Sequence, residues 1–247
     1  MIMERVGYKR AKQTAMLNFD VRQGTSDIKA VEEVFKNNSY QRKSFKVEKG
    51  DRWIDMGANI GAFSVMANAI SGNPVVSFEA DETNAQITAH NIKTNGFSPD
   101  VKRAAVMPND HPGSTVTFYV SHRPMALRRH SIYQPKKDFQ AMTIPAMRFS
   151  DCVEYGRSRI GADCIKFNIE GVEIPIIRSL DFESSIVGIK KIVLEWSFDK
   201  EPKMAVLHET LARLRQIFTY VDCNKKINIP NETWPFYPPN LFIYAMR

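Results

Sequence analysis

Apolar and polar residues along the chain follow two periods, and together these predict an α/β fold. Five short apolar runs have the length and composition of buried strands, at residues 47–56, 74–79, 100–106, 162–173 and 191–196. The segments 62–69 and 82–92, which separate the first three runs, carry apolar residues at helical spacing. Because strands and helices alternate in this way, we expect a doubly wound, mostly parallel sheet whose carboxyl edge forms a binding crevice.

The segments on either side of this unit extend the pattern. At the N-terminus, residues 28–35 predict a helix with Thr25 or Ser26 as its N-cap, within a region 1–46 that would act as a cap. Further helices are expected at 149–155, 174–180 and 201–218, and further strands at 218–221 and 241–246. We expect the last strand to be antiparallel. Since no linker or repeat interrupts the chain, residues 1–247 should form a single domain.

Residues 113–147 depart from this order and predict an inserted β-pair with a basic loop. Residues 114–120 and 142–147 alternate as half-exposed antiparallel strands do. The loop between them, 121–137, has many basic residues and no acidic one, and loops of this length are usually functional or disordered. It is either a solvated basic loop or a surface for an anionic substrate such as nucleic acid. Its candidate substrate-binding residues are Arg123, Arg128, Arg129, His130 and Tyr133.

A glycine turn after the first strand is the clearest candidate for a binding site. Asp55 ends the strand, and Gly57 and Gly61 follow before a helix begins. The G-x-x-x-G spacing differs from that of dinucleotide sites and P-loops, and no lysine follows to bind a phosphate. The acid would repel a pyrophosphate but attract an ammonium group. These features favour S-adenosylmethionine, which carries an amino-acid end and a sulfonium and has no phosphate.

A second acid ends the next strand. Glu79 follows an apolar run about twenty residues after the glycines, where a carboxylate can accept hydrogen bonds from both ribose hydroxyls. Either acid alone is compatible with a solvent-exposed strand end. The ordered pair of Asp55 and Glu79 around a glycine turn favours a cofactor site.

Composition limits the class of protein. With 247 residues, 43% hydrophobic and 25% charged, the chain can bury an ample core. The net charge of +7 suits either a polyanionic partner or simple solubility. Three cysteines without C-x-x-C spacing argue against a disulfide framework and against a zinc site, so no metal is expected. With no signal peptide and no apolar run of membrane-spanning length, we expect a cytoplasmic protein without a membrane partner.

Several segments together resemble the FkbM-type methyltransferase family. They are Asp-Met-Gly-Ala-Asn-Ile-Gly-Ala-Phe-Ser at 55–64, Phe-Glu-Ala-Asp at 78–81, Ile-Lys-Phe-Asn-Ile-Glu-Gly-Val-Glu at 165–173, Val-Leu-Glu-Trp at 193–196 and Asn-Leu-Phe-Ile-Tyr-Ala at 240–245. The resemblance implies a Rossmann-like class I methyltransferase fold with S-adenosylmethionine as methyl donor, usually for O-methylation of a sugar or other small hydroxyl compound. The expected cofactor contacts are Asp55, Gly57, Ala58, Asn59, Gly61, Glu79, Ala80 and Ala105, with Thr25 and Ser26 in the segment that would cap the cofactor.

The fourth strand and the residues after it carry the candidates for catalysis. Glu170 is the first candidate, as a base or substrate holder, with Asn168 and Lys166 on the same face if the strand stays regular to its end. Glu173 and Glu195 are second choices, and either is equally suited to capping or surface pairing. The family usually has Asp at the position of Asn168. An amide neither takes up a proton at neutral pH nor brings charge to a cation, so this departure affects a role as base or metal ligand.

Three functions are compatible with these features. The first is a methyltransferase for the hydroxyl of a sugar or other small acceptor, and the second is an RNA or DNA methyltransferase that holds the phosphate backbone with residues 121–137. The third is a non-catalytic cofactor-binding module, which Asn168 would allow. No D/N-P-P-Y/F motif follows the fourth strand, which weighs against the adenine-N6 class.

Overall fold

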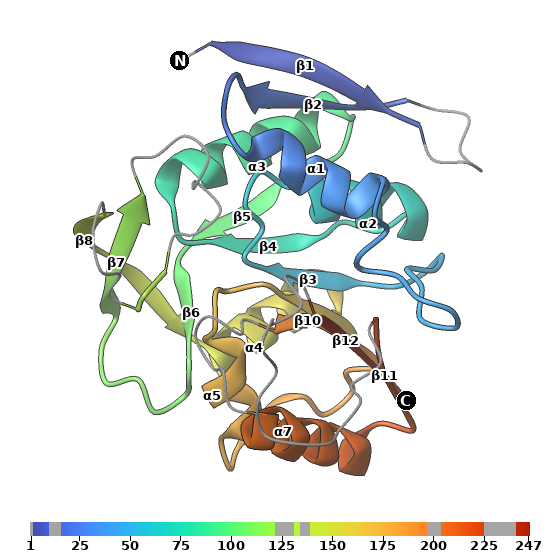
Figure 1. The fold of residues 1–247 in the computed structure, drawn as a ribbon, viewed down its shortest axis with the longest axis vertical. Helices are drawn as coiled ribbons and strands as arrows, with labels where there is room; N and C mark the ends of the chain where they lie inside the picture. Colours follow the sequence, from blue (N-terminus) through green and yellow to red (C-terminus); the bar gives the residue numbers. More distant parts are fainter. Residues whose placement is uncertain (1, 10–15, 122–130, 134–138, 197–203, 225–240) are drawn as a thin grey trace.

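The computed structural model describes residues 2–9, 16–121, 131–133, 139–196, 204–224 and 241–247. Its centre is a seven-stranded sheet in the order β11-β12-β10-β9-β3-β4-β5 (Figure 1). The strands are β3 (Trp53–Met56), β4 (Val76–Glu79), β5 (Asp100–Arg103), β9 (Cys164–Phe167), β10 (Lys191–Trp196), β11 (Tyr220–Cys223) and β12 (Leu241–Met246). β12 is antiparallel to both of its neighbours, and the other adjacent strands are parallel. The expected doubly wound sheet with an antiparallel strand at 241–246 is therefore confirmed.

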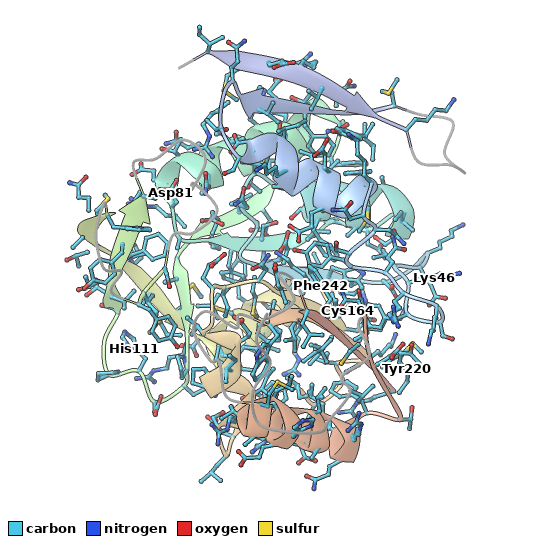
Figure 2. The ribbon with its side chains drawn as sticks, in the orientation of Figure 1. Lys46, Asp81, His111, Cys164, Tyr220 and Phe242 are labelled. Atoms are coloured by element: carbon cyan, nitrogen blue, oxygen red, sulfur yellow. The ribbon has the colours of Figure 1, made fainter. Side chains whose placement is uncertain are left out.

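Helices cover both faces of this sheet (Figure 1), and a cluster of buried apolar side chains lies between the sheet and the helices on each face. One face is covered by α1 (Asp27–Phe35), α2 (Ala62–Ser71) and α3 (Glu82–Thr94), and the other by α4 (Phe149–Ile160), α5 (Glu173–Arg178), α6 (Phe182–Ser185) and α7 (Met204–Ile217). Successive side chains of a strand point to opposite faces, so on β3 Trp53 joins the first cluster while Ile54 joins the second. Cys164 and Phe242, both labelled in Figure 2, also belong to the cluster of Trp53.

The N-terminal region contains more than the helix that the sequence predicts. β1 (Met3–Tyr8) and β2 (Leu17–Arg22) form an antiparallel hairpin before α1. The side chains of Asn91 on α3 and of Asn95, its C-cap residue, accept hydrogen bonds from the backbone N–H groups of Asp20 (2.8 Å) and Asn18 (2.9 Å). These bonds satisfy backbone donors of β2 and fasten the hairpin to the helix layer.

The start of α1 is fixed by an ion pair as well as by a local turn. Ser26 holds the N-cap position, but its hydroxyl makes no capping hydrogen bond; instead Thr25 Oγ1 accepts from the N–H of Asp27 (3.2 Å). The carboxylate of Asp27 binds the guanidinium of Arg22 at 2.8 Å, and both side chains are buried. Arg22 also donates to Asn84 Oδ1 (2.7 Å), so the start of α1 is tied to α3.

A second, smaller sheet lies beside the edge of the first. The predicted third strand divides at Ala104: residues before it form β5 of the large sheet, and β6 (Ala105–Met107) pairs in parallel with β8 (Phe139–Arg148). β8 also pairs antiparallel with β7 (Thr115–Ser121). The two alternating segments thus form an antiparallel pair, while most of the basic loop between them lies outside the described residues.

The boundaries of two predicted elements differ from the structure. The predicted strand 162–173 ends at Phe167, and a turn follows in which Glu170 has a left-handed backbone (φ 57°). The predicted helix 149–155 continues to Ile160 and has Arg148 at its N-cap. Among the described residues, no helix combines the length and apolar character needed to cross a membrane. All three cysteines are buried free thiols.

Candidate active site

A cavity lies beside β3, where the order of the strands along the chain reverses. β4 follows β3 directly in the chain, whereas β9 lies on its other side after a long connection, and ligands of such sheets bind at this reversal of strand order. The cavity contains about 870 Å³ of empty space, counting the part open to solvent. Its lining includes Glu33, Tyr40, Gly57, Ala58, Asn59, Glu79, Ala80, Ala105, Phe118, Ile132, Lys166, Asn168 and Glu170.

The glycine turn brings two backbone segments into contact. Gly57 has a left-handed backbone (φ 81°), and a Cβ at this position would stand 1.8 Å from the carbonyl oxygen of Asn168. The N–H groups of Gly57 and Ala58 both donate to the carbonyl of Phe78, at 2.9 and 3.0 Å. These two hydrogen bonds therefore hold the turn against β4. The rest of the turn lines the cavity.

Asp55 does not lie where the sequence suggested. Its carboxylate is fully buried, outside the cavity lining, and forms an ion pair with Nζ of Lys166 (Oδ1–Nζ 2.8 Å). Ser64 donates a hydrogen bond to its other oxygen (2.6 Å). Because an internal ammonium group already neutralises Asp55, this acid is not the partner of a ligand ammonium that its position in the sequence predicted.

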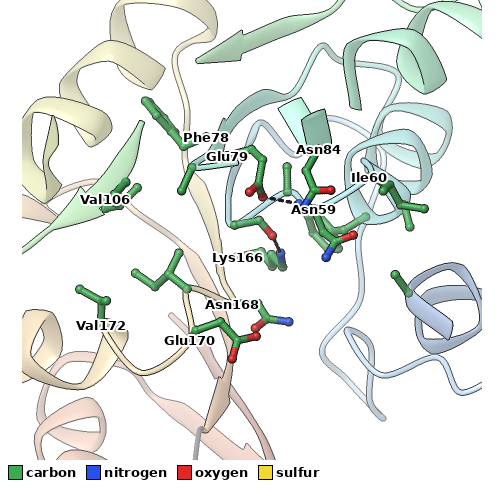
Figure 3. A pocket seen from close by; sticks show the side chains of 18 of the residues that line it. Asn59, Ile60, Phe78, Glu79, Asn84, Val106, Lys166, Asn168, Glu170 and Val172 are labelled. Carbon is green, nitrogen blue, oxygen red and sulfur yellow. Dashed lines mark hydrogen bonds between the residues drawn. The ribbon is translucent and has the colours of Figure 1, made fainter. Parts of the chain in front are cut away.

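Lys166 belongs to the framework of the site rather than to its reactive groups. Besides binding Asp55, its Nζ donates to the carbonyl of Gly57 (2.7 Å), as Figure 3 shows. The side chain is 3% exposed and bridges β9 to the turn after β3. Its catalytic role, expected from strand alternation, is thus replaced by a structural one.

Glu79 faces the cavity beside the glycine turn (Figure 3). Its Oε2 accepts from the N–H of Asn59 (2.7 Å) and its Oε1 from the N–H of Asp81 (2.9 Å). Burial raises the pKa of this carboxyl to about 7, against the effect of these two hydrogen bonds and of the charge on Lys166. The side chain is held in one orientation, as a ribose-binding residue requires.

Three glutamates with different environments remain: Glu170 and Glu173 follow β9, and Glu195 lies within β10. Glu170 lines the cavity in the turn after β9, next to Asn168 (Figure 3). Glu173 is fully buried outside the lining, and both of its carboxylate oxygens accept from the N–H of Gly171 (3.2 and 3.1 Å). This contact closes the turn before α5 and argues against the catalytic role suggested for Glu173. Glu195 accepts from the side chain of Asn168 (2.7 Å).

The N-terminal region contributes a different wall from the one expected. Thr25 and Ser26 are not in the cavity lining, which instead contains Ala30, Glu33 and Val34 of α1, together with Tyr40. Residues 30, 33 and 34 share one helix face. Glu33 is only 3% exposed. The sequence could have indicated this residue, because an acid on the apolar face of a predicted helix is unusual unless it serves a site.

The expected substrate-binding residues are only partly visible. Arg123, Arg128, Arg129 and His130 lie outside the described residues. Tyr133 is 38% exposed and donates to the carbonyl of Gly171 (3.4 Å), but it is not part of the cavity lining.

The cavity fits S-adenosylmethionine by the chemistry of its lining. One end is apolar, with Ala105, Val106, Phe118 and Ile132, and suits an adenine ring. The polar part contains the carboxylates of Glu33, Glu79 and Glu170, which suit a cationic ligand without phosphate. Within the described part of the chain, no group of three or more His, Cys, Asp or Glu side chains is arranged to hold a metal ion.

Comparison with known proteins gives a match to one family profile and a set of similar solved structures. The profile of the methyltransferase FkbM domain matches residues 55–226, more than half of the chain. No curated protein sequence matches.

Similar solved structures include three methyltransferases. One is an S-adenosylmethionine-dependent O-methyltransferase from Thermotoga maritima, with 14% identity and a TM-score of 0.41 over 88% of this chain and 70% of that one. Another is a precorrin-6y C5,15-methyltransferase from Geobacter metallireducens, with 12% identity and a TM-score of 0.43 over 97% and 93%. A third is the tRNA (uracil-54, C5)-methyltransferase of Pyrococcus abyssi in complex with S-adenosyl-L-homocysteine, with 12% identity and a TM-score of 0.42 over 98% and 43%. At these scores, none of the three assigns a substrate to this chain.

The family profile begins at Asp55, near the end of β3, and extends past β11. It therefore includes the glycine turn, Glu79, and the turn after β9 that carries Asn168 and Glu170. The chain belongs to the FkbM methyltransferase family and is an S-adenosylmethionine-dependent methyltransferase.

Proposed function

We propose that this enzyme methylates a hydroxyl group of a sugar or other small acceptor. The observation that carries the proposal is the charge of the cavity. Its lining contains the carboxylates of Glu33, Glu79 and Glu170, and its one cation among the described residues, Lys166, is already paired with Asp55. Such a lining favours a neutral acceptor rich in hydrogen-bonding groups over a polyphosphate chain.

The cofactor would be held by residues of the first half of the sheet. Glu79 is placed to accept hydrogen bonds from the ribose hydroxyls, and Ala105, Phe118 and Ile132 offer apolar surface to the adenine. When bound, S-adenosylmethionine supplies a methyl group activated by a positive sulfonium.

Glu170 is the residue that we propose to bind the acceptor hydroxyl and to take up its proton. For methyl transfer the protein mainly has to align the acceptor with the methyl group. A base is needed in addition because the acceptor hydroxyl must lose its proton. Glu170 adopts a left-handed backbone, which costs a non-glycine residue about 1–2 kcal/mol and is found preferentially at functional sites. This conformation supports a functional role for the turn after β9.

To test this, the protein is incubated with labelled S-adenosylmethionine and, in separate assays, with panels of glycans, small hydroxyl compounds, RNA and DNA. Transfer of label to a hydroxyl of a glycan or small compound is expected, with the rate of Glu170→Gln reduced by about 10²–10⁴-fold. Glu154→Gln, a change at an exposed acid of α4, is the matched control and should leave the rate unchanged. Label found only in nucleic acid, or full activity of Glu170→Gln, would contradict the proposal.

A further inference from the structure

The side chain of Asn168 connects three parts of the chain that meet at the cavity. Its Nδ2 atom donates to Oε2 of Glu195 at 2.7 Å and to the hydroxyl of Tyr40 at 3.1 Å. Asn168 follows β9, Glu195 belongs to β10, and Tyr40 lies between α1 and β3. The asparagine and the tyrosine both line the cavity.

The partners of this amide determine which way round it stands. A carboxamide has one N–H₂ group with two hydrogens and one carbonyl oxygen, whereas an ionised carboxylate only accepts hydrogen bonds. Nδ2 must therefore face Glu195, and the second hydrogen is directed to Tyr40. Both donors are used within the protein, so Oδ1 is the atom with which Asn168 can bind a ligand.

The surroundings of the amide are rigid. The backbone N–H of Asn168 donates to the carbonyl of Met56 (3.0 Å). Tyr40 is 4% exposed and packs edge-on against the rings of Phe63 and Phe242, each at 5.2 Å between centroids. Because the packed Tyr40 ring cannot follow a rotating side chain, a rotation of the amide would break its hydrogen bond to the tyrosine.

We propose that Glu195 is a positioning residue that fixes the Asn168 amide, so that Asn168 Oδ1 accepts a hydrogen bond from a second hydroxyl of the methyl acceptor, next to the one that reacts. The identity of that ligand group rests on the proposed function, whereas the coupling of Asn168 to Glu195 does not. The reacting hydroxyl then donates its hydrogen to the carboxylate of Glu170, while the neutral oxygen at position 168 holds its neighbour. A carboxylate at position 168 would face Glu195 at hydrogen-bonding distance, and two like charges so close cannot both ionise.

A charge-exchange cycle tests the coupling. Asn168→Asp places two carboxylates together and is expected to lower kcat/KM by at least about tenfold at pH 8, with recovery as the pH falls and the pair takes up a shared proton. In Asn168→Asp/Glu195→Gln the glutamine donates to the new carboxylate, and the rate should return to within about threefold of the wild type. Glu195→Gln alone retains an acceptor for Nδ2 and should stay within about threefold, whereas Glu195→Ala should lose about tenfold.

Two further measurements separate positioning from a general loss of structure. The affinity for S-adenosyl-L-homocysteine should be the same in all four variants, because Glu79 and the apolar end of the cavity bind the cofactor. Glu209→Gln, a change at an exposed acid of α7, is the control and should behave as wild type throughout.

The outcomes also distinguish this proposal from the proposed function. If no hydroxyl acceptor is methylated, the urea midpoints of the free proteins still report the coupling: Asn168→Asp should lower the midpoint at pH 8, and the added Glu195→Gln should restore it. A wild-type rate and a flat pH profile for Asn168→Asp would overturn the proposal, and so would a double variant that recovers neither rate nor midpoint.

Discussion

The Nζ atom of Lys166 lies 2.8 Å from Oδ1 of Asp55, in a fully buried pair that joins β9 to β3 beneath the glycine turn. Removing one member leaves the other charge buried without its partner. Lys166→Met should therefore lower the free energy of unfolding by about 3–5 kcal/mol, measured by urea denaturation at pH 7. Asp55→Asn/Lys166→Met should recover much of this loss. An unchanged midpoint for Lys166→Met would show that the pair does not stabilise the fold.

Gly57→Ala should damage the site far more than an alanine at another left-handed glycine. At Gly57 the new Cβ would stand 1.8 Å from the carbonyl oxygen of Asn168, whereas at Gly72 (φ 74°) it would meet nothing within 4 Å. Both changes pay about 1–2 kcal/mol for the left-handed backbone, but only Gly57→Ala must also displace the turn after β9. Urea denaturation and calorimetry with S-adenosyl-L-homocysteine compare the two. Equal effects at both positions would refute the close contact.

Glu79→Ala should weaken cofactor binding by about 1.5–3 kcal/mol, the range for a hydrogen bond to a charged group. The reason is that Glu79 lines the cavity in a fixed orientation, held by the N–H groups of Asn59 and Asp81. Calorimetry with S-adenosyl-L-homocysteine measures the change, with Glu82→Ala, a substitution at an exposed acid, as control. An unchanged dissociation constant would remove Glu79 from the cofactor site.

The raised pKa of Glu79 predicts a dependence of stability on pH. Its pKa is about 7 in the folded protein against an ordinary value of 4.5, so between these values the folded state holds a proton that the unfolded state has lost. The free energy of unfolding should therefore fall as the pH rises through this window, by up to about 3 kcal/mol, and change no further above it. Urea denaturation at pH 5 and pH 8 should show this component in the wild type and not in Glu79→Gln. Identical pH profiles of the two proteins would contradict the prediction.

Nucleic-acid binding through the basic loop makes a separate prediction about salt. If Arg128 and Arg129 bind a phosphate backbone, replacing both by Ala should flatten the dependence of log affinity on log salt by about 0.7–0.9 for each lost contact. If the acceptor is small, as proposed here, nucleic-acid binding should be absent at low salt and the double variant should match the wild type. Filter binding across a salt series, with calorimetry of the cofactor as control, decides between these results.

The sequence by itself determined most of the order of elements and several of the residues that line the cavity. Apolar runs identified the central strands β3, β4, β9 and β10 of the large sheet, because burial on both faces leaves a largely apolar pattern. Gly57, Glu79, Ala80 and Ala105 were found for a similar reason: they stand at strand ends or in a tight turn, and parallel strands bring those points to one edge.

Only the tertiary structure decided how the charged side chains are paired. Asp55 and Lys166 are 111 residues apart, so local pattern could not show that the lysine neutralises the acid expected to face the cofactor. Strand alternation placed Lys166, Asn168 and Glu170 on one face, but β9 ends at Phe167 and the turn separates their roles. Tyr40 and Glu33 reach the cavity through the packing of α1 over the sheet. Ion pairs and cavity walls depend on contacts distant in sequence, whereas strands and turns leave their pattern in neighbouring residues.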